Sequence, residues 1–191
     1  MNMQETNDFS PYRRHLKTKI METAMKAFRT QGVRKVRMDD IAEELSISKR
    51  TVYEIFGTKE HLVYECVVKY KEDESSKLSE LAAHCLNVME ILLIIYKRRI
   101  ENTKRTNILF YLDLRRYSSV MQLLKERNEH NRELCQRFIK RGIEEGYFRS
   151  SLDHQLTSLI FDALGRYLMD NHLYERYSIE EIYHNLVFVY D

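Results

Sequence analysis

The chain has 191 residues and a formal net charge of only +2, from 31 basic and 29 acidic residues. Five glycines, one proline and the lack of long strand-like alternation favour an all-α fold over β-rich classes. No apolar run approaches the roughly 20 residues that span a bilayer, and the N-terminus lacks an apolar signal region, so we expect a soluble cytoplasmic protein.

The first predicted helix runs from about residue 13 to residue 30. Its apolar residues Ile20, Ala24 and Phe28 recur at helical spacing and therefore share one face. Gly32 follows in the position where helices commonly end in a left-handed residue. We expect the helix to stop there.

Residues 38–56 have the pattern of two short helices joined by a tight turn. Ile41, Ala42 and Leu45 share one face of the first helix, and Val52, Ile55 and Phe56 share one face of the second. Ile47 lies in the turn, where it can fill the angle between the helices, and Ser48 is a good N-cap for the second helix. This pattern is typical of a helix-turn-helix.

The outward face of the second short helix carries groups that bind DNA. Lys49, Arg50, Thr51 and Tyr53 offer cations and hydroxyls for phosphates and base edges. Residues 1–60 hold 12 basic against 9 acidic residues, whereas the remainder holds 19 against 20. A basic N-terminal third on a near-neutral body suits a small DNA-binding head, although charge runs are often only solvated helix faces.

Six further helices are predicted, with Thr58, Asp153 and Ser178 as N-caps of the first, fifth and sixth. The predicted ranges are 59–84, 87–101, 107–117, 120–142, 154–171 and 179–190. Gly146, Tyr147 and Phe148 are expected to form a turn and a short extended piece. The last two helices carry apolar stripes that can close the core or meet a partner subunit.

The first sixty residues resemble the TetR family of bacterial transcriptional regulators. Residues 41–62 read I-A-E-E-L-S-I-S-K-R-T-V-Y-E-I-F-G-T-K-E-H-L, where the family pattern is close to I-A-x-x-x-G-V-S-x-x-T-L-Y-x-Y-F-x-x-K-E-x-L. The tyrosine, the phenylalanine and the K-E-x-L element extend beyond what any helix-turn-helix needs. The resemblance covers about a third of the chain.

The resemblance implies a DNA-binding domain over residues 1–57 and an all-helical domain for ligand binding and dimerisation over residues 58–191. From this resemblance and from the expected helix caps, the residues predicted to contact DNA are Arg37, Ser48, Lys49, Arg50, Thr51, Tyr53 and Lys59. Lys59 would hold a phosphate at the start of its helix. For Tyr53 an alternative is that the ring packs and only the hydroxyl reaches a phosphate.

Three positions depart from the family pattern. Ser46 replaces the usual glycine of the turn, so a residue with a side chain has to adopt a left-handed conformation. Arg37 replaces the usual Ser or Thr cap of the first short helix and is instead free to touch a phosphate. Arg50 replaces a common glycine and adds a cation on the DNA-facing side.

An effector pocket is predicted among the helices at 87–101, 107–117, 120–142 and 154–171. The residues proposed to line it are Tyr96, Phe110, Tyr111, Asp113, Tyr117 and Phe161. An equally open interpretation is that these aromatic residues simply fill the core.

We therefore expect a homodimeric, ligand-responsive repressor of a palindromic double-stranded DNA operator, with an unknown small-molecule effector and no cofactor. Alternatives are the same fold acting as an activator or without a ligand. A helical enzyme or a plain interaction module are further alternatives. No catalytic motif or metal cluster supports an enzyme, and the single Glu181-x-x-His184 pair lacks the second copy that a metal bundle needs.

The three cysteines, Cys66, Cys85 and Cys135, form no disulfide framework and no C-x-x-C zinc pair. We expect them to be small buried hydrophobic residues in a reducing compartment. A redox-sensing thiol is the alternative, if one of them is exposed and has a lowered pKa.

Overall fold

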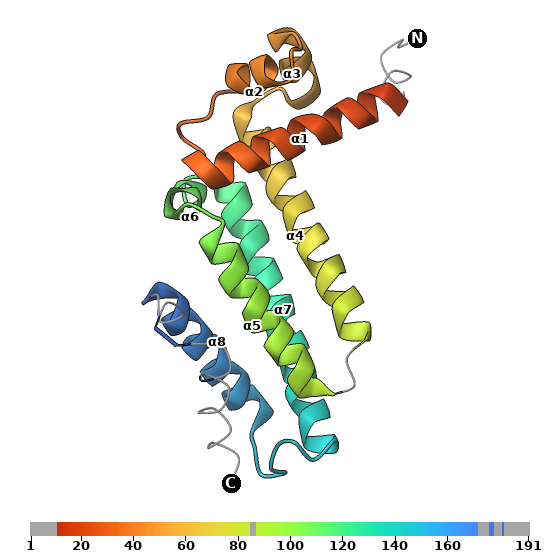
Figure 1. Ribbon diagram of the computed structural model, residues 1–191, viewed down its shortest axis with the longest axis vertical. Coiled ribbons are helices and arrows are strands. Elements are labelled where there is room, and N and C mark those ends of the chain that lie inside the picture. Colours follow the sequence, from red (N-terminus) through yellow and green to blue (C-terminus); the bar gives the residue numbers. More distant parts are fainter. Residues whose placement is uncertain (1–10, 85–86, 172–175, 178–180, 182–191) are drawn as a thin grey trace. The chain divides into compact units, whose positions relative to one another are not determined.

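The computed structural model describes residues 11–84, 87–171, 176–177 and 181. All regular secondary structure in these residues is helical, which confirms the all-α prediction (Figure 1). The helices are α1 (Pro11–Gln31), α2 (Met38–Glu44), α3 (Lys49–Phe56), α4 (Lys59–Ala83), α5 (Val88–Lys104), α6 (Ile108–Leu114), α7 (Ser118–Glu144) and α8 (His154–Asp170). Within the described ranges, none of these helices is long and apolar enough to cross a membrane.

The chain divides into two compact units that are both discontinuous in sequence. The first comprises Met1–Asp73 with Arg105–Leu123, and the second comprises Glu74–Lys104 with Leu124–Asp191. Only the described residues of each are discussed below. The functional boundary between residues 57 and 58 stays a prediction.

Helix boundaries agree with the sequence to within two residues except at the end of α5, which reaches Lys104 instead of residue 101, around α6 and after α7. The helix predicted to reach residue 117 ends at Leu114, because the backbone turns and the Tyr117 N–H donates to the Leu114 carbonyl. The extended piece predicted at Tyr147 and Phe148 is wrong. Both N–H groups donate to the Gly142 carbonyl, at 2.9 and 3.0 Å, and so form a turn. The helix predicted at 179–190, with its cap Ser178, lies outside the described residues except for position 181.

Side-chain caps begin three helices as the sequence predicts. The Ser48 hydroxyl accepts the Thr51 N–H at 3.1 Å, and the Thr58 hydroxyl accepts the His61 N–H at 3.2 Å. The Asp153 carboxylate accepts two N–H groups at the start of α8 at 2.8 Å each. The first N–H groups of a helix lack the carbonyl four residues earlier that later ones use, so each cap fixes where its helix begins.

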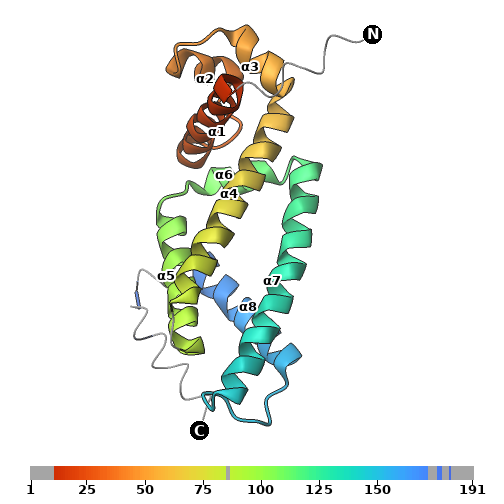
Figure 2. The same ribbon diagram turned by 90° about the vertical axis from the view of Figure 1, so that its right-hand side faces the viewer.

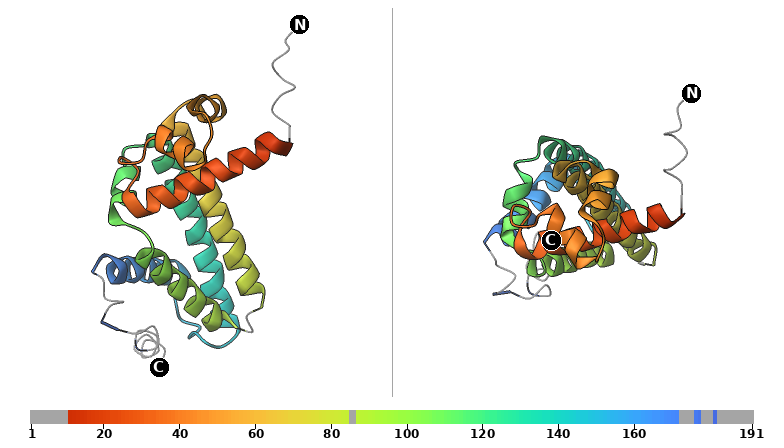
Figure 3. Two further views of the ribbon diagram at one scale, coloured as in Figure 1. Left: turned by 45° about the horizontal axis from the view of Figure 1, so that its top comes forward. Right: turned by 90° about the horizontal axis from the view of Figure 1, so that it is seen from above.

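The first unit packs α1 against α2 and α6, and α2 against α3 (Figures 1 and 2). Ile20, Ala24 and Phe28 are buried along one face of α1, as their helical spacing predicts. Burying large apolar side chains such as Ile20 and Phe28 stabilises the fold by about 1.5–3 kcal/mol each. Figure 3 shows α6 beside the C-terminal end of α1. This core holds the α2–α3 pair in place.

Hydrogen bonds tie the end of α1 to the segment that leads into α6. The Asn107 N–H donates to the Arg29 carbonyl at 2.7 Å, and the Arg34 N–H donates to the Asp113 carboxylate at 2.8 Å. Gly32 has a φ of +85°, and a Cβ there would lie 2.9 Å from the Leu109 Cβ. The chain therefore needs glycine at this junction both for its conformation and for space.

The second unit contains a core of Val88, Ile139 and Phe148. Phe148 lies against Gly142 of α7 so closely that a Cβ at position 142 would overlap its ring. The turn after α7 thus folds back onto the helix that precedes it. α8 packs on α5 within the same unit.

Candidate DNA-binding site

The turn between α2 and α3 is closed by backbone hydrogen bonds and by one left-handed residue. The Ile47 N–H donates to the Ala42 carbonyl at 2.9 Å. Ser46 has a φ of +53°, the only positive value among the described non-glycine residues. The expected left-handed conformation at Ser46 is confirmed, and it costs about 1–2 kcal/mol relative to the right-handed one.

α3 presents its cations to solvent while its apolar face is buried. Val52 and Phe56 lie in the core, whereas the side chains of Lys49 and Arg50 are 67 % and 87 % exposed. A helix held in this way by packing on one side has its opposite side available to enter a major groove. Both cations are therefore accessible on the side of α3 opposite its buried face.

Each of these cations is held by a carboxylate. Lys49 Nζ lies 2.7 Å from Asp39 Oδ2 of α2, and Arg50 Nε lies 2.6 Å from Glu54 Oε1 one turn along α3. The hydrogen bond from Lys49 lowers the pKa of Asp39, and the hydrogen bond to Glu54 raises the pKa of Arg50. These two acids were not predicted as part of the site. The four-residue spacing of Arg50 and Glu54 is a signal that identifies one of them.

Ser48, Thr51 and Tyr53 complete the outward face of α3. The Ser48 and Thr51 hydroxyl oxygens lie 2.8 Å apart, in addition to the cap that Ser48 forms with the Thr51 N–H. Tyr53 is about half exposed, and its hydrogen bond is one of the contributions that lower the pKa of Asp39. The three hydroxyls are therefore grouped at the end of α3 that carries Lys49.

Arg37 precedes α2 and does not cap it with its side chain. Instead the backbone N–H of Arg37 donates to the carboxylate of Asp40 at 2.7 Å. A side chain of α2 thus fixes the first turn by bonding back to the residue before the helix. The guanidinium is largely exposed and lies 3.7 Å from Asp39 Oδ2. The cation is thus accessible, as a phosphate contact needs.

Lys59 begins α4 and reaches back toward the loop before α2. Its Nζ donates to the Arg34 carbonyl at 3.4 Å. Partial burial lowers the pKa of Lys59, although the carboxylates of Asp113 and Asp40 act in the opposite direction. The side chain lies next to the α4 N-terminus, where the N–H groups favour an anion.

The residues predicted to line an effector pocket fall in different compact units. Phe110, Tyr111, Asp113 and Tyr117 belong to the first unit, while Tyr96 and Phe161 are in helices of the second and their side chains lie outside the described part. Phe110 and Asp113 are buried and Tyr111 is exposed. Burial raises the pKa of Tyr117, with a further contribution from Asp113. Asp113 anchors the Arg34 N–H, and its ligand-binding role stays a prediction.

Cys66 of α4 has the properties of a buried hydrophobic residue. Its thiol donates to the Met21 carbonyl at 3.5 Å, and burial raises its pKa to about 12. At neutral pH it carries almost no thiolate, which is the reactive form. Cys135 is partly buried, and Cys85 lies outside the described residues.

We expect Cys66 to resist alkylation in the folded protein. At pH 7.5, iodoacetamide should modify it more than tenfold more slowly than in the urea-unfolded chain, because both burial and the raised pKa suppress the thiolate. Peptide mass spectrometry over time measures the rate at each cysteine. Equal rates in the folded and unfolded states would instead support the interpretation of Cys66 as a redox sensor.

Comparison with known proteins finds a family whose sequence profile matches the helix-turn-helix. Residues 20–66, which include α2, α3 and the start of α4, match the profile "Bacterial regulatory proteins, tetR family". The chain is 25% identical over 143 residues to the HTH-type transcriptional repressor KstR2 of Mycobacterium tuberculosis, covering 72% of each protein. The match thus extends from the helix-turn-helix into the helical body.

Solved structures share the fold along most of the chain. A putative transcriptional regulator from Saccharomonospora viridis in complex with choline superposes with a TM-score of 0.74 at 19% identity, covering 91% of this chain and 94% of that one. A TetR-family regulator from Cytophaga hutchinsonii gives a TM-score of 0.74 at 16% identity, with 93% and 94% covered. Over residues 20–66 the chain is therefore similar to the TetR family of bacterial regulatory proteins, and it shares an all-helical fold with solved transcriptional regulators.

Proposed function

We propose that this protein is a homodimeric, ligand-responsive repressor that binds a palindromic operator. The observation that carries the proposal is the exposed face of α3, where Lys49 and Arg50 project from a helix whose other side is buried. In this proposal residues 1–57 form the DNA-binding domain and residues 58–191 the ligand and dimer domain. The protein acts in the cytoplasm, where its operator is accessible.

The DNA contacts divide by chemistry. Lys49, Arg50, Thr51 and Tyr53 enter the major groove, where cations and hydroxyls meet base edges and flanking phosphates. The Ser48 hydroxyl and the Arg37 guanidinium contact the backbone at the edges of this face. Lys59, together with the N–H groups at the start of α4, holds a further phosphate.

The dimer interface is proposed to be a four-helix interface formed by the helices at 154–171 and 179–190 of each copy, of which the first is α8. Its apolar stripe is unusually accessible in the single chain, with exposed fractions of 58% for Leu156, 48% for Leu159, 55% for Ile160 and 59% for Tyr167. Ser158 of the same helix is buried. A continuous apolar stripe facing water is typical of a surface that pairs with a second copy.

The dimer is tested by charging this stripe. Ile160→Glu is expected to convert the protein to a monomer in size-exclusion chromatography with light scattering, because the carboxylate would be buried without a partner. Ile108→Glu, at an exposed position of α6, is the matched control and should leave the mass unchanged. A wild-type monomer, a dimer that survives Ile160→Glu, or loss of the dimer in Ile108→Glu contradicts the assignment.

In this proposal the response to a ligand depends on effector binding by the helical domain. The helical body is proposed to bind the effector, and the choline complex of the S. viridis regulator supports small-molecule binding by this fold. Effector binding lowers DNA affinity only if the effector binds more tightly to the state that does not bind DNA. The KstR2 relatives are transcriptional repressors, which supports repression here.

The operator is identified by selecting genomic fragments that the purified protein retains and sequencing them. We expect a palindrome whose half-sites lie about 34–36 Å apart or at a multiple of that spacing, since each α3 of the dimer occupies one major groove. In vitro transcription from such a promoter should fall when the protein is added. Increased transcription would contradict repression, and retention of unrelated fragments would contradict sequence-specific binding.

A further inference from the structure

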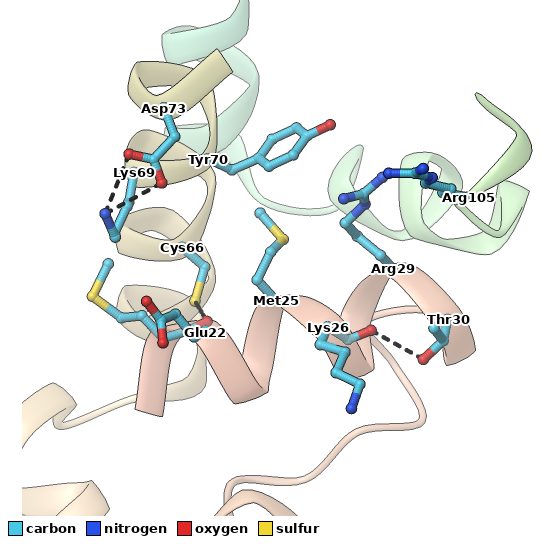
Figure 4. Close-up of a pocket in the computed structure, with 11 residues that line it drawn as sticks. Glu22, Met25, Lys26, Arg29, Thr30, Cys66, Lys69, Tyr70, Asp73 and Arg105 are labelled. Atoms are coloured by element: carbon cyan, nitrogen blue, oxygen red, sulfur yellow. Dashed lines mark hydrogen bonds and ion pairs between the residues drawn. The ribbon is translucent and has the colours of Figure 1, made fainter. Parts of the chain in front are cut away.

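A pocket of about 310 Å³ lies on the first compact unit. It is formed by the C-terminal half of α1, the first half of α4 and Arg105 (Figure 4). Its volume is at the lower end of the range for small-molecule sites. The predicted effector residues do not line it.

The floor of the pocket is apolar. Met21 and Cys66 are buried beneath it, and Met25 and Tyr70 are half-buried along its wall. Figure 4 shows the Met25 side chain pointing into the space between Tyr70 and Arg29. Thioether and aromatic groups of this kind adapt to the apolar part of a small ligand.

One end of the pocket carries positive charge without a carboxylate. The Arg29 guanidinium donates two hydrogen bonds to the Thr106 hydroxyl, at 3.0 and 2.8 Å, and stacks over the Tyr70 ring with its Cζ 5.0 Å from the ring centroid. These partners are uncharged. Neither Arg29 nor Arg105 forms an ion pair within the described residues.

The other charges of the lining do not cancel this end. Lys69 is paired with Asp73 at 3.2 Å, so that this cation is already compensated. Glu22 lies on the side near Cys66, away from Arg29 and Arg105 (Figure 4). The pocket is therefore polarised, with an apolar middle and a cationic end.

We propose that this pocket binds a small organic carboxylate. Its carboxylate accepts hydrogen bonds from Arg29 and Arg105, whose planar guanidinium groups match the geometry of a carboxylate. Its apolar part lies against Met25 and Tyr70. The occupied site would join α1, α4 and the segment before α6, so that binding stabilises the unit that carries the helix-turn-helix.

Methyl NMR of the full-length protein with ¹³C-labelled methionine tests the site without DNA. Titration with 4-phenylbutanoate should shift the Met21 and Met25 methyl signals in a saturable way, with these signals assigned through Met→Leu variants. The uncharged isostere 4-phenylbutanamide should bind more weakly, by about tenfold or more. Inorganic phosphate should not shift these signals at the same concentration, because it has no apolar part.

Arg105→Gln should weaken 4-phenylbutanoate binding about tenfold, the factor expected for one lost charge-assisted hydrogen bond. Arg105 is exposed, so the substitution leaves the core intact. Lys140→Gln, at an exposed position of α7 in the second unit, should leave binding unchanged. Any of four results overturns the proposal: no saturable shift at Met21 and Met25, equal binding of the amide, equal binding of phosphate, or undiminished binding by Arg105→Gln.

Discussion

Replacing Lys49 and Arg50 together with glutamine is expected to weaken operator binding by about one to two orders of magnitude, since a specific interaction with a base is worth about 1–3 kcal/mol. The dependence of log K on log salt should also become shallower, by about 0.9 for each phosphate that the variant no longer neutralises. Both side chains are more than half exposed, so the fold should be unaffected. Fluorescence anisotropy with an operator duplex at several salt concentrations measures both quantities.

Glu54→Gln is the matched variant on the same helix and should act in the opposite direction. It removes the carboxylate that lies 2.6 Å from Arg50 Nε, and it also removes a negative charge that repels phosphates. We expect tighter binding to both operator and unrelated DNA. Unchanged affinity in the Lys49 and Arg50 double variant would refute the assignment of α3 as the helix that reads DNA.

Gly32→Ala is expected to lower the free energy of unfolding by about 2–4 kcal/mol, the combined cost of a left-handed alanine and of an overpacked contact. The φ of Gly32 is +85°, and the added Cβ would lie 2.9 Å from the Leu109 Cβ and 3.0 Å from the Asp113 carboxylate. The substitution therefore pushes α6 away from the end of α1. Urea denaturation followed by circular dichroism measures the decrease in stability.

Gly57→Ala separates the two causes. Gly57 also has a positive φ, of +66°, but a Cβ there would meet no atom within 4 Å. Its ψ of −60° places it in a γ-turn, closed by the Thr58 N–H and the Phe56 carbonyl at 2.6 Å, so Gly57→Ala should cost only the conformational part, about 1–3 kcal/mol. If both variants were destabilised equally, the close approach of α6 to Gly32 would contribute nothing.

Residues close together in the sequence predicted the caps and the helix ends of the site. The Ser48 cap and the end of α3 before Gly57 each follow from residues within four positions, whereas the left-handed Ser46 follows from the resemblance to a pattern with glycine in the turn. Arg50 and Glu54 are likewise one helical turn apart. For such features the backbone geometry of a single helix end determines which groups meet.

Contacts between distant residues could not be predicted in the same way. Nothing near Asp113 indicates that its carboxylate accepts the Arg34 N–H, and nothing near Asp39 indicates that it holds Lys49 across the turn. The pocket with Arg29 and Arg105 joins helices that are far apart in sequence. Such pairs depend on how helices cross, which a periodic apolar pattern leaves undetermined.

The hydrogen bond between Arg34 and Asp113 has a consequence for synthesis of the chain. Its two residues are 79 positions apart, and at about 5–20 residues per second the ribosome needs about 4–16 s to pass from one to the other. α2 and α3 are made within that interval, and until it ends the segment before α2 lacks the carboxylate that fixes it. The nascent protein therefore completes its DNA-binding unit only after α6 has emerged, and a fragment cut after residue 73 would lack the same support.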